Sequence, residues 1–115
     1  MNHVVQCGSL DRTLAALADP TRRAAIERLG RGSATITDLA MPSGISLTGM
    51  KKHVRVLEDA GLVRTTKVGR ARRCELSRRP LDDVEEWMSS YRQMVEDRLD
   101  RLGELLETPN EETKR

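Results

Sequence analysis

The feature that most constrains the fold is a pair of short amphipathic segments separated by a break at residues 42–44, Pro-Ser-Gly. Before the break, Thr35 or Thr37 can start a short helix, because a threonine hydroxyl accepts a hydrogen bond from a free N–H of the first turn. After the break, Ser46 is a suitable N-cap for a longer helix, and Gly61 can end it. The sequence therefore predicts two helices joined by a sharp turn.

The second helix of this pair has two different faces. Its apolar side chains recur at spacings of three and four residues and predict a buried ridge, formed by Leu47, Met50, Val54 and Leu57. The opposite face is polar and basic, with Thr48, Gly49, Lys51, Lys52 and Arg55. One face is therefore expected in the core and the other in solvent.

Two short extended segments, residues 62–67 and 72–77, follow this helix. Gly69 lies between them and suits a tight turn, so we expect a β-hairpin. Cys74 and Leu76 alternate toward the interior, which predicts that Cys74 is a buried small hydrophobe. A short helix, a sharp turn, a longer capped helix and a hairpin, in this order, predict a winged helix-turn-helix.

Further helices are expected on both sides of this unit. Ser9 can cap a first helix, and Asp19 with Pro20 reads as the N-cap and first residue of the next. The first helix carries its apolar residues on one face, at Leu10, Leu14 and Leu17. A last helix is expected from Pro80 to about Leu106, with apolar residues repeating every three and a half positions, which favours packing along another helix.

The expected fold class is mainly α with a β-hairpin wing. One domain of residues 9–107 is expected between a flexible N-terminal arm, residues 1–8, and a disordered tail, residues 108–115. With one Trp, one Tyr and no Phe, the core must be built from aliphatic side chains and methionine.

The formal net charge of +2 hides an uneven distribution. Residues 46–79 carry ten basic and three acidic side chains, a net charge of +7, whereas residues 80–115 carry five basic and eleven acidic ones, a net charge of −6. Such a local excess indicates a face that binds a polyanion. The acidic side chains of the last helix are interpreted as its solvated face rather than as catalytic pairs.

The basic stretch predicts an interface with double-stranded DNA, with the second helix in the major groove and the hairpin on the backbone or in the minor groove. The candidate DNA-binding residues are Ser46, Thr48, Gly49, Lys51, Lys52, Arg55, Lys67, Arg70, Arg72 and Arg73. Gly49 is expected to allow close approach to DNA. The alternative is that the hairpin charges only keep it soluble. His53 could contact phosphate, but a structural or surface role is expected for it, as for His3.

Several function classes are excluded. No apolar run approaches the roughly 20 residues of a membrane-spanning helix, and the N-terminus lacks the basic and apolar regions of a signal peptide, so a cytoplasmic location is expected. Two cysteines make no disulfide framework there. No phosphate-binding loop, nucleophile elbow or metal-hydrolase motif occurs, so no enzyme and no cofactor are predicted.

The segments LAALADPTRRAAIERL, TDLA and KKHVRVLEDAGLV, followed by the basic hairpin, resemble the ArsR-type winged-helix repressors over about residues 10–106. The resemblance implies a five-helix homodimer that pairs through its first and last helices, binds an operator and often releases it on sensing a ligand. The side chains expected at the dimer interface are Leu10, Leu14, Leu17, Trp87, Tyr91, Met94, Leu99 and Leu102.

The departures from that family concern metal sensing. Metal-sensing members carry a Cys-x-Cys-Asp-Leu run at the third helix, where this chain has Thr35 and Thr37 in the two cysteine places. The last helix, where other members bind metal, has no histidine. Because thiolate or imidazole donors are missing, no metal is expected at either site.

The sequence thus predicts a homodimeric, often autoregulatory repressor that binds an operator and has no metal control at the usual sites. The alternative is a winged-helix module for protein interaction without specific operator binding. The effector is left open. A thiol switch that pairs Cys7 between subunits is an alternative that a reducing cytosol disfavours.

Overall fold

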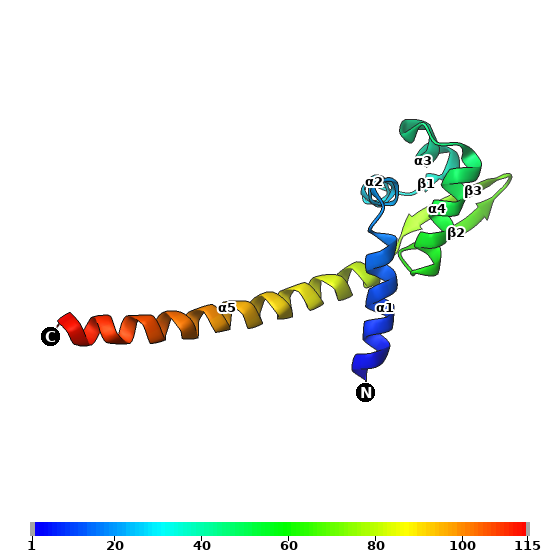
Figure 1. The fold of residues 1–115 in the computed structure, drawn as a ribbon. Coiled ribbons are helices and arrows are strands. Elements are labelled where there is room, and N and C mark those ends of the chain that lie inside the picture. The colour runs from blue at the N-terminus through cyan, green and yellow to red at the C-terminus, as the bar shows by residue number, and fades with distance from the viewer. Residues whose placement is uncertain (1, 115) are drawn as a thin grey trace. The chain divides into compact units, whose positions relative to one another are not determined.

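A computed structural model describes the backbone of residues 2–114 and the side chains of residues 8–106. Its elements are, in chain order, α1 (Asn2–Ala16), α2 (Pro20–Leu29), β1 (Ala34–Thr35), α3 (Ile36–Ser43), α4 (Leu47–Asp59), β2 (Val63–Val68), β3 (Ala71–Leu76) and α5 (Arg79–Lys114) (Figure 1). The chain divides into two compact units, residues up to 84 and residues from 85 onward. The expected helix-turn-helix followed by a hairpin is confirmed in the first unit.

Side-chain caps begin α2, α3 and α4 at residues that the sequence predicts. The Asp19 carboxylate accepts the N–H of Arg22 at the start of α2, and Pro20 is the first helical residue. At α3 the N-cap is Thr35, not Thr37: its hydroxyl accepts the N–H of Asp38, whose carboxylate accepts the N–H of Thr35. This reciprocal capping box satisfies two backbone donors.

The break between α3 and α4 begins two residues later than expected. α3 continues through Pro42 to Ser43, the break spans residues 44–46, and Gly44 has a left-handed φ of +67°. The Ser46 hydroxyl then accepts the N–H of Gly49 at 3.0 Å and caps α4. A glycine is needed at residue 44 because a Cβ disfavours this backbone region.

The core of the first unit lies between α4, the sheet and the shorter helices. On α4, Met50, Val54 and Leu57 are at most 2% exposed, as the predicted ridge requires. Leu47 is the exception, because 45% of it is exposed. The partly buried Ile45, just before α4, packs against the core.

The hairpin supplies two strands of a three-stranded antiparallel sheet in the order β1-β3-β2, in which β3 is central. Its strands are shifted by one residue from the expected ranges, and they join through a two-residue turn at Gly69, whose φ is +62°. The third strand, β1, was not expected from the sequence; its Ala34 pairs with Cys74. Cys74 is fully buried, as predicted.

The first helix differs from its expected form. α1 begins at Asn2, seven residues before Ser9, and the Ser9 carbonyl accepts a bond from the Thr13 hydroxyl at 3.0 Å. The face turned to the core carries Thr13 and Ala16, each 1% exposed, whereas Leu14 is 38% exposed. The fully buried face of α1 is therefore formed by small side chains, not by the leucines whose spacing predicted it.

The ends of the chain continue these helices. The backbone of residues 2–8 belongs to α1, and α5 continues through residues 107–114 instead of ending near Leu106. The flexibility assigned to the arm and the tail stays a prediction. The side chains of His3 and Cys7 lie outside the described ones.

The second unit is α5 from residue 85 onward. Its apolar side chains are largely exposed, from 37% to 70%, at Trp87, Met88, Tyr91, Met94, Val95, Leu99, Leu102, Leu105 and Leu106. The rings of Trp87 and Tyr91 stack with centroids 6.0 Å apart. Elsewhere on the helix, Arg92 pairs with Glu96 at 3.5 Å. Within residues 2–114, no helix is both long and apolar enough to cross a membrane.

Candidate nucleic-acid interface

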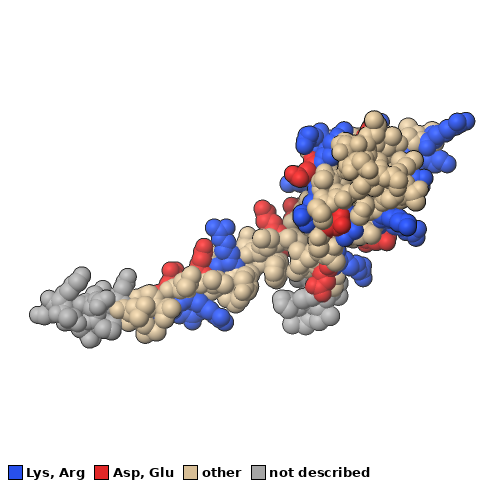
Figure 2. All heavy atoms as spheres, turned by 45° about the horizontal axis from the view of Figure 1, so that its top comes forward, with Lys and Arg blue, Asp and Glu red and all other residues tan. Residues whose placement is uncertain are grey.

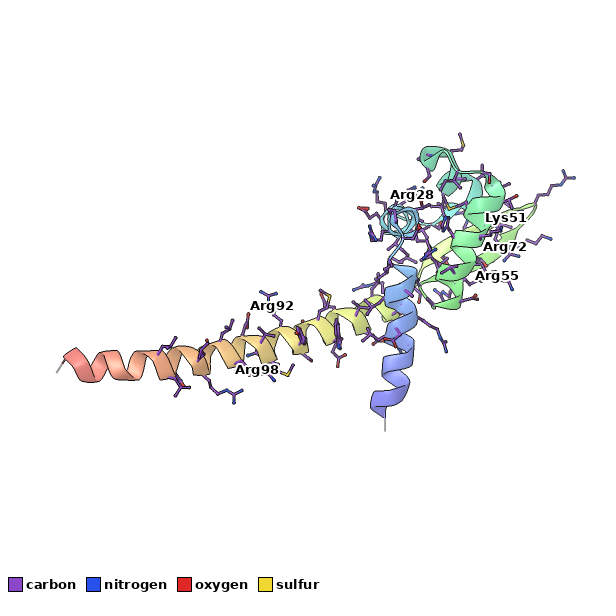
Figure 3. All side chains as sticks on the ribbon, viewed as in Figure 1. Arg28, Lys51, Arg55, Arg72, Arg92 and Arg98 are labelled. Atoms are coloured by element: carbon purple, nitrogen blue, oxygen red, sulfur yellow. The ribbon has the colours of Figure 1, made fainter. Side chains whose placement is uncertain are left out.

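A groove of about 680 Å³ runs between α4 and the wing, which is the hairpin of β2 and β3. Five basic side chains line it: Lys51 and Arg55 from α4, and Lys67, Arg70 and Arg72 from the wing. Figure 3 shows three of them, Lys51, Arg55 and Arg72, close together on α4 and the neighbouring strand. Figure 2 shows Lys and Arg side chains projecting outward from the part of the chain that carries the hairpin.

The groove is not uniformly basic. Apolar side chains of Ile36, Leu47 and Val54 line it, of which only Leu47 is substantially exposed. The acidic side chains of Glu58 and Asp59, at the end of α4, line it as well. A polyanion is therefore attracted toward the beginning of α4 and the wing tip, and repelled from the end of the helix.

A chain of hydrogen bonds connects the wing to α4. The Thr65 hydroxyl on β2 donates to the Glu58 carboxylate at 2.8 Å, and the Arg72 guanidinium on β3 donates to the Thr65 oxygen at 2.8 Å. Glu58 thereby helps to fix the wing against the helix and holds Arg72 beside the groove. Thr65 had no predicted role, because its alternation in β2 gives no sign of a long-range partner.

Arg73 points away from the groove. It follows Arg72 in β3, and successive side chains of a strand face opposite sides of a sheet. Its guanidinium donates to the Ser33 hydroxyl at 2.9 Å, before β1. The same alternation that predicts a buried Cys74 also predicts this difference, because Arg72 lies on the face of the strand that carries Cys74 and Arg73 lies on the opposite face.

The other candidate side chains of α4 lie outside the groove. Ser46, Thr48 and Lys52 are exposed. Packing explains why residue 49 is a glycine. A Cβ at this position would lie 2.9 Å from the Ile45 Cγ2 and 3.2 Å from the Ser46 Oγ. The close packing of the turn against the first turn of α4 thus leaves no room for a larger residue.

His53 has a structural role, as expected. Its Nδ1 lies 3.3 Å from Arg22 Nη1 and 3.9 Å from Asp19 Oδ2. Arg22 also donates to the carbonyls of Ala16, at 2.6 Å, and Ala15, at 3.2 Å, and so caps the end of α1. The Arg22 backbone N–H is the main cause that lowers the pKa of Asp19, with His53 contributing. These contacts join α1, α2 and α4.

The Cys74 thiol and the possible metal ligands among the described side chains form neither a reactive thiol nor a metal site. Burial is the main cause that raises the pKa of the Cys74 thiol, which favours the unreactive thiol form. Among the described residues, no group of three or more His, Cys, Asp or Glu side chains is placed to hold a metal ion. The Thr35 hydroxyl is engaged in the capping box of α3.

The helix-turn-helix part of the chain is similar in sequence to known proteins. A sequence profile described as a helix-turn-helix domain matches residues 17–66. The HTH-type transcriptional regulator Rv2034 of Mycobacterium tuberculosis is 44% identical over 55 residues, which are 48% of this chain and 51% of that protein. The chain spans about half the length of the curated relatives it matches.

Solved structures match over more of the chain. The crystal structure of the ArsR family transcriptional regulator RHA00566 has 43% identity and a TM-score of 0.74, over 77% of this chain and 92% of that one. The winged helix-turn-helix domain of Mb0332 from Mycobacterium bovis, described as homodimeric and DNA-binding, has 19% identity and a TM-score of 0.63, over 86% and 89% of the two chains. The latter likeness shows the fold alone.

The fold places the chain among the winged helix-turn-helix transcriptional regulators. Its identity to RHA00566 over nearly all of that chain shows the family: the chain belongs to the ArsR family of transcriptional regulators. Members of this class are regulators and not enzymes.

Proposed function

We propose that the protein binds a double-stranded DNA operator as a homodimer and represses transcription. Its own promoter is one expected target, because repressors of this kind are often autoregulatory. The observation that carries this proposal is the groove between α4 and the wing, where five basic side chains from the helix and the hairpin line one concave surface. A helix of this kind fits the major groove, which is wide enough for one helix. Basic side chains of α4 and of the wing then contact the phosphates on the two sides of the DNA major groove.

The basic residues have different parts in this proposal. Lys51 and Arg55 line the groove between α4 and the wing, whereas Lys52 is exposed outside this groove. Lys67 and Arg70 lie at the wing tip, where arginine suits the negative potential of a narrow minor groove. Arg73, whose guanidinium is bonded to Ser33, is left as a support of the sheet rather than a DNA contact.

The test is fluorescence anisotropy on the duplex upstream of the protein's own gene, against a scrambled duplex of equal length, at several salt concentrations. The triple variant Lys51→Ala, Lys52→Ala, Arg55→Ala is expected to lose the preference for the upstream duplex. Each phosphate contact that is lost reduces the magnitude of the negative slope of log K against log salt by about 0.9. Unfolding is checked by circular dichroism.

A matched control removes three charges elsewhere, with Arg12→Ala, Arg31→Ala and Arg92→Ala, which are exposed and outside the groove. The control is expected to keep its sequence preference. If the wild type shows equal affinity for both duplexes, operator binding at this promoter is refuted, and protein interaction becomes the better explanation of the basic groove.

Dimerisation is supported by α5. Its exposed apolar side chains recur along one stripe, from Trp87 to Leu106, and such a stripe costs free energy in water unless another helix covers it. Tyr91, Met94, Leu99 and Leu102 belong to the stripe, as proposed from the sequence. On α1, Leu14 is exposed and remains a candidate, whereas Leu17 packs partly against its own core. Leu10 is half-buried.

Control by metal is not part of the proposal. The two threonines in the cysteine places supply hydroxyls, which are poor ligands for soft and borderline metals, and the Thr35 hydroxyl is already bonded to the Asp38 N–H. We expect DNA affinity to be unchanged by zinc or nickel ions at concentrations that leave the protein folded. Release of the DNA at equimolar metal would contradict this.

A further inference from the structure

Leu47, the first residue of α4, lies where its sequence spacing does not place it. Its spacing from Met50 and Val54 assigns it to the buried ridge, and yet it is 45% exposed while they are 0% and 2% exposed. Ile45 packs against the core beside them. The Leu47 side chain lines the groove instead, in the company of Lys51.

The surroundings of Leu47 restrict what can cover it. Groove residues near it include basic side chains of α4 and the wing, which attract a polyanion. An apolar group that is carried by a polyanion suits both Leu47 and these basic side chains. The C5-methyl group of thymine meets both conditions, because it is the apolar group that DNA presents on the floor of the major groove.

We propose that Leu47 is a specificity-determining residue that contacts a thymine methyl group in the operator. This inference rests on the proposed DNA binding and goes further, since it assigns a base to a side chain. The position on α4 supports it: residues at the N-terminal end of a recognition helix are the ones that contact base edges. The Ser46 cap and the tight fit of Gly49 against Ile45 fix the direction of this first turn.

The first step of the test finds the site. The full-length wild-type protein is used to enrich duplexes from a random pool, and the enriched sequence is verified by anisotropy. Failure to enrich any sequence overturns the proposed function, and the inference falls with it. An enriched site that contains no thymine refutes the Leu47 contact alone and leaves specific DNA binding intact.

The second step removes the methyl group alone. Each thymine of the enriched site is replaced in turn by deoxyuridine, which pairs identically but lacks the C5-methyl. For the wild type, one thymine in each half-site is expected to show a loss of about fourfold in affinity. This factor corresponds to about 0.8 kcal/mol for one buried methyl-sized group, at 1.4 kcal/mol for each tenfold change.

Variants assign the effect to the side chain. In Leu47→Ala, the deoxyuridine penalty at that thymine is expected to disappear, whereas Leu47→Met keeps an apolar side chain of similar reach and keeps the penalty. Val56→Ala is the matched control, because Val56 is another exposed apolar residue of α4, 40% exposed, that does not line the groove. A penalty that persists unchanged in Leu47→Ala refutes the inference, as does a wild type without any penalty.

Discussion

The glycine at residue 49 permits a sharp test of why α4 begins as it does. In a helix interior, alanine is favoured over glycine by roughly 0.5–1 kcal/mol. At this position the added Cβ would lie 2.9 Å from the Ile45 Cγ2 and 3.2 Å from the Ser46 Oγ. Ile45 is β-branched and packs against the core, so it has little freedom to move aside.

Overpacking of this kind costs typically 1–3 kcal/mol. Set against the gain in helix propensity, Gly49→Ala is expected to lower the free energy of unfolding by about 1 kcal/mol. For a domain of this size, that corresponds to a fall in Tm of about 5 °C. The measurement is thermal unfolding followed by circular dichroism at one fixed protein concentration, because dimerisation makes the Tm depend on concentration.

Two variants separate crowding from other causes. Gly8→Ala makes the same exchange in α1, where nothing lies within 4 Å of the new Cβ, and is expected to raise the Tm by a few degrees. In the double variant Gly49→Ala, Ile45→Leu, the crowding methyl group is absent and much of the lost stability should return. A rise in Tm for Gly49→Ala alone, equal to that of Gly8→Ala, would refute the packing explanation and leave close approach to DNA as the reason for the glycine.

Three further perturbations follow from the contacts. Thr65→Val keeps the shape of the side chain but removes both bonds of the chain from Glu58 to Arg72, so amide hydrogen exchange in β2 and β3 should accelerate; unchanged protection would show that these bonds do not hold the wing. The lowered pKa of Asp19 means that its stabilisation is present above the ordinary aspartate pKa and is lost as the pH falls through the lowered value. The stability advantage of the wild type over Asp19→Asn, from urea unfolding at each pH, should therefore shrink as the pH falls through the lowered pKa of Asp19, and an advantage that stays unchanged in acid would contradict this. On α5, Leu99→Glu should shift sedimentation from dimer toward monomer, whereas Ser89→Glu, also exposed, should not, and equal effects would contradict dimerisation through the apolar stripe.

Most of the fold could be predicted because its signals are local. Asp19 and Ser46 cap helices through their own side chains, and Gly69 turns the hairpin through its own backbone. The missed strand, β1, has only two residues, too few to show an alternating pattern, and it exists because Ala34 pairs with Cys74 forty residues later. Pairing at such a distance leaves no trace in either segment alone.

The candidate site was predicted less completely, because an excess of charge identifies a region but not the direction of each side chain. Arg72 and Arg73 have the same charge and adjacent positions, but one faces the groove and is tied to Thr65 while the other is bonded to Ser33. Leu47 shows the same limit for apolar residues. Spacing assigned it to the ridge, but Ile45 packs against the core just before α4 begins, and so leaves Leu47 on the groove. Periodicity describes a helix of unlimited length, whereas the first residue of a real helix has neighbours on only one side along the axis, and Leu47 is that first residue.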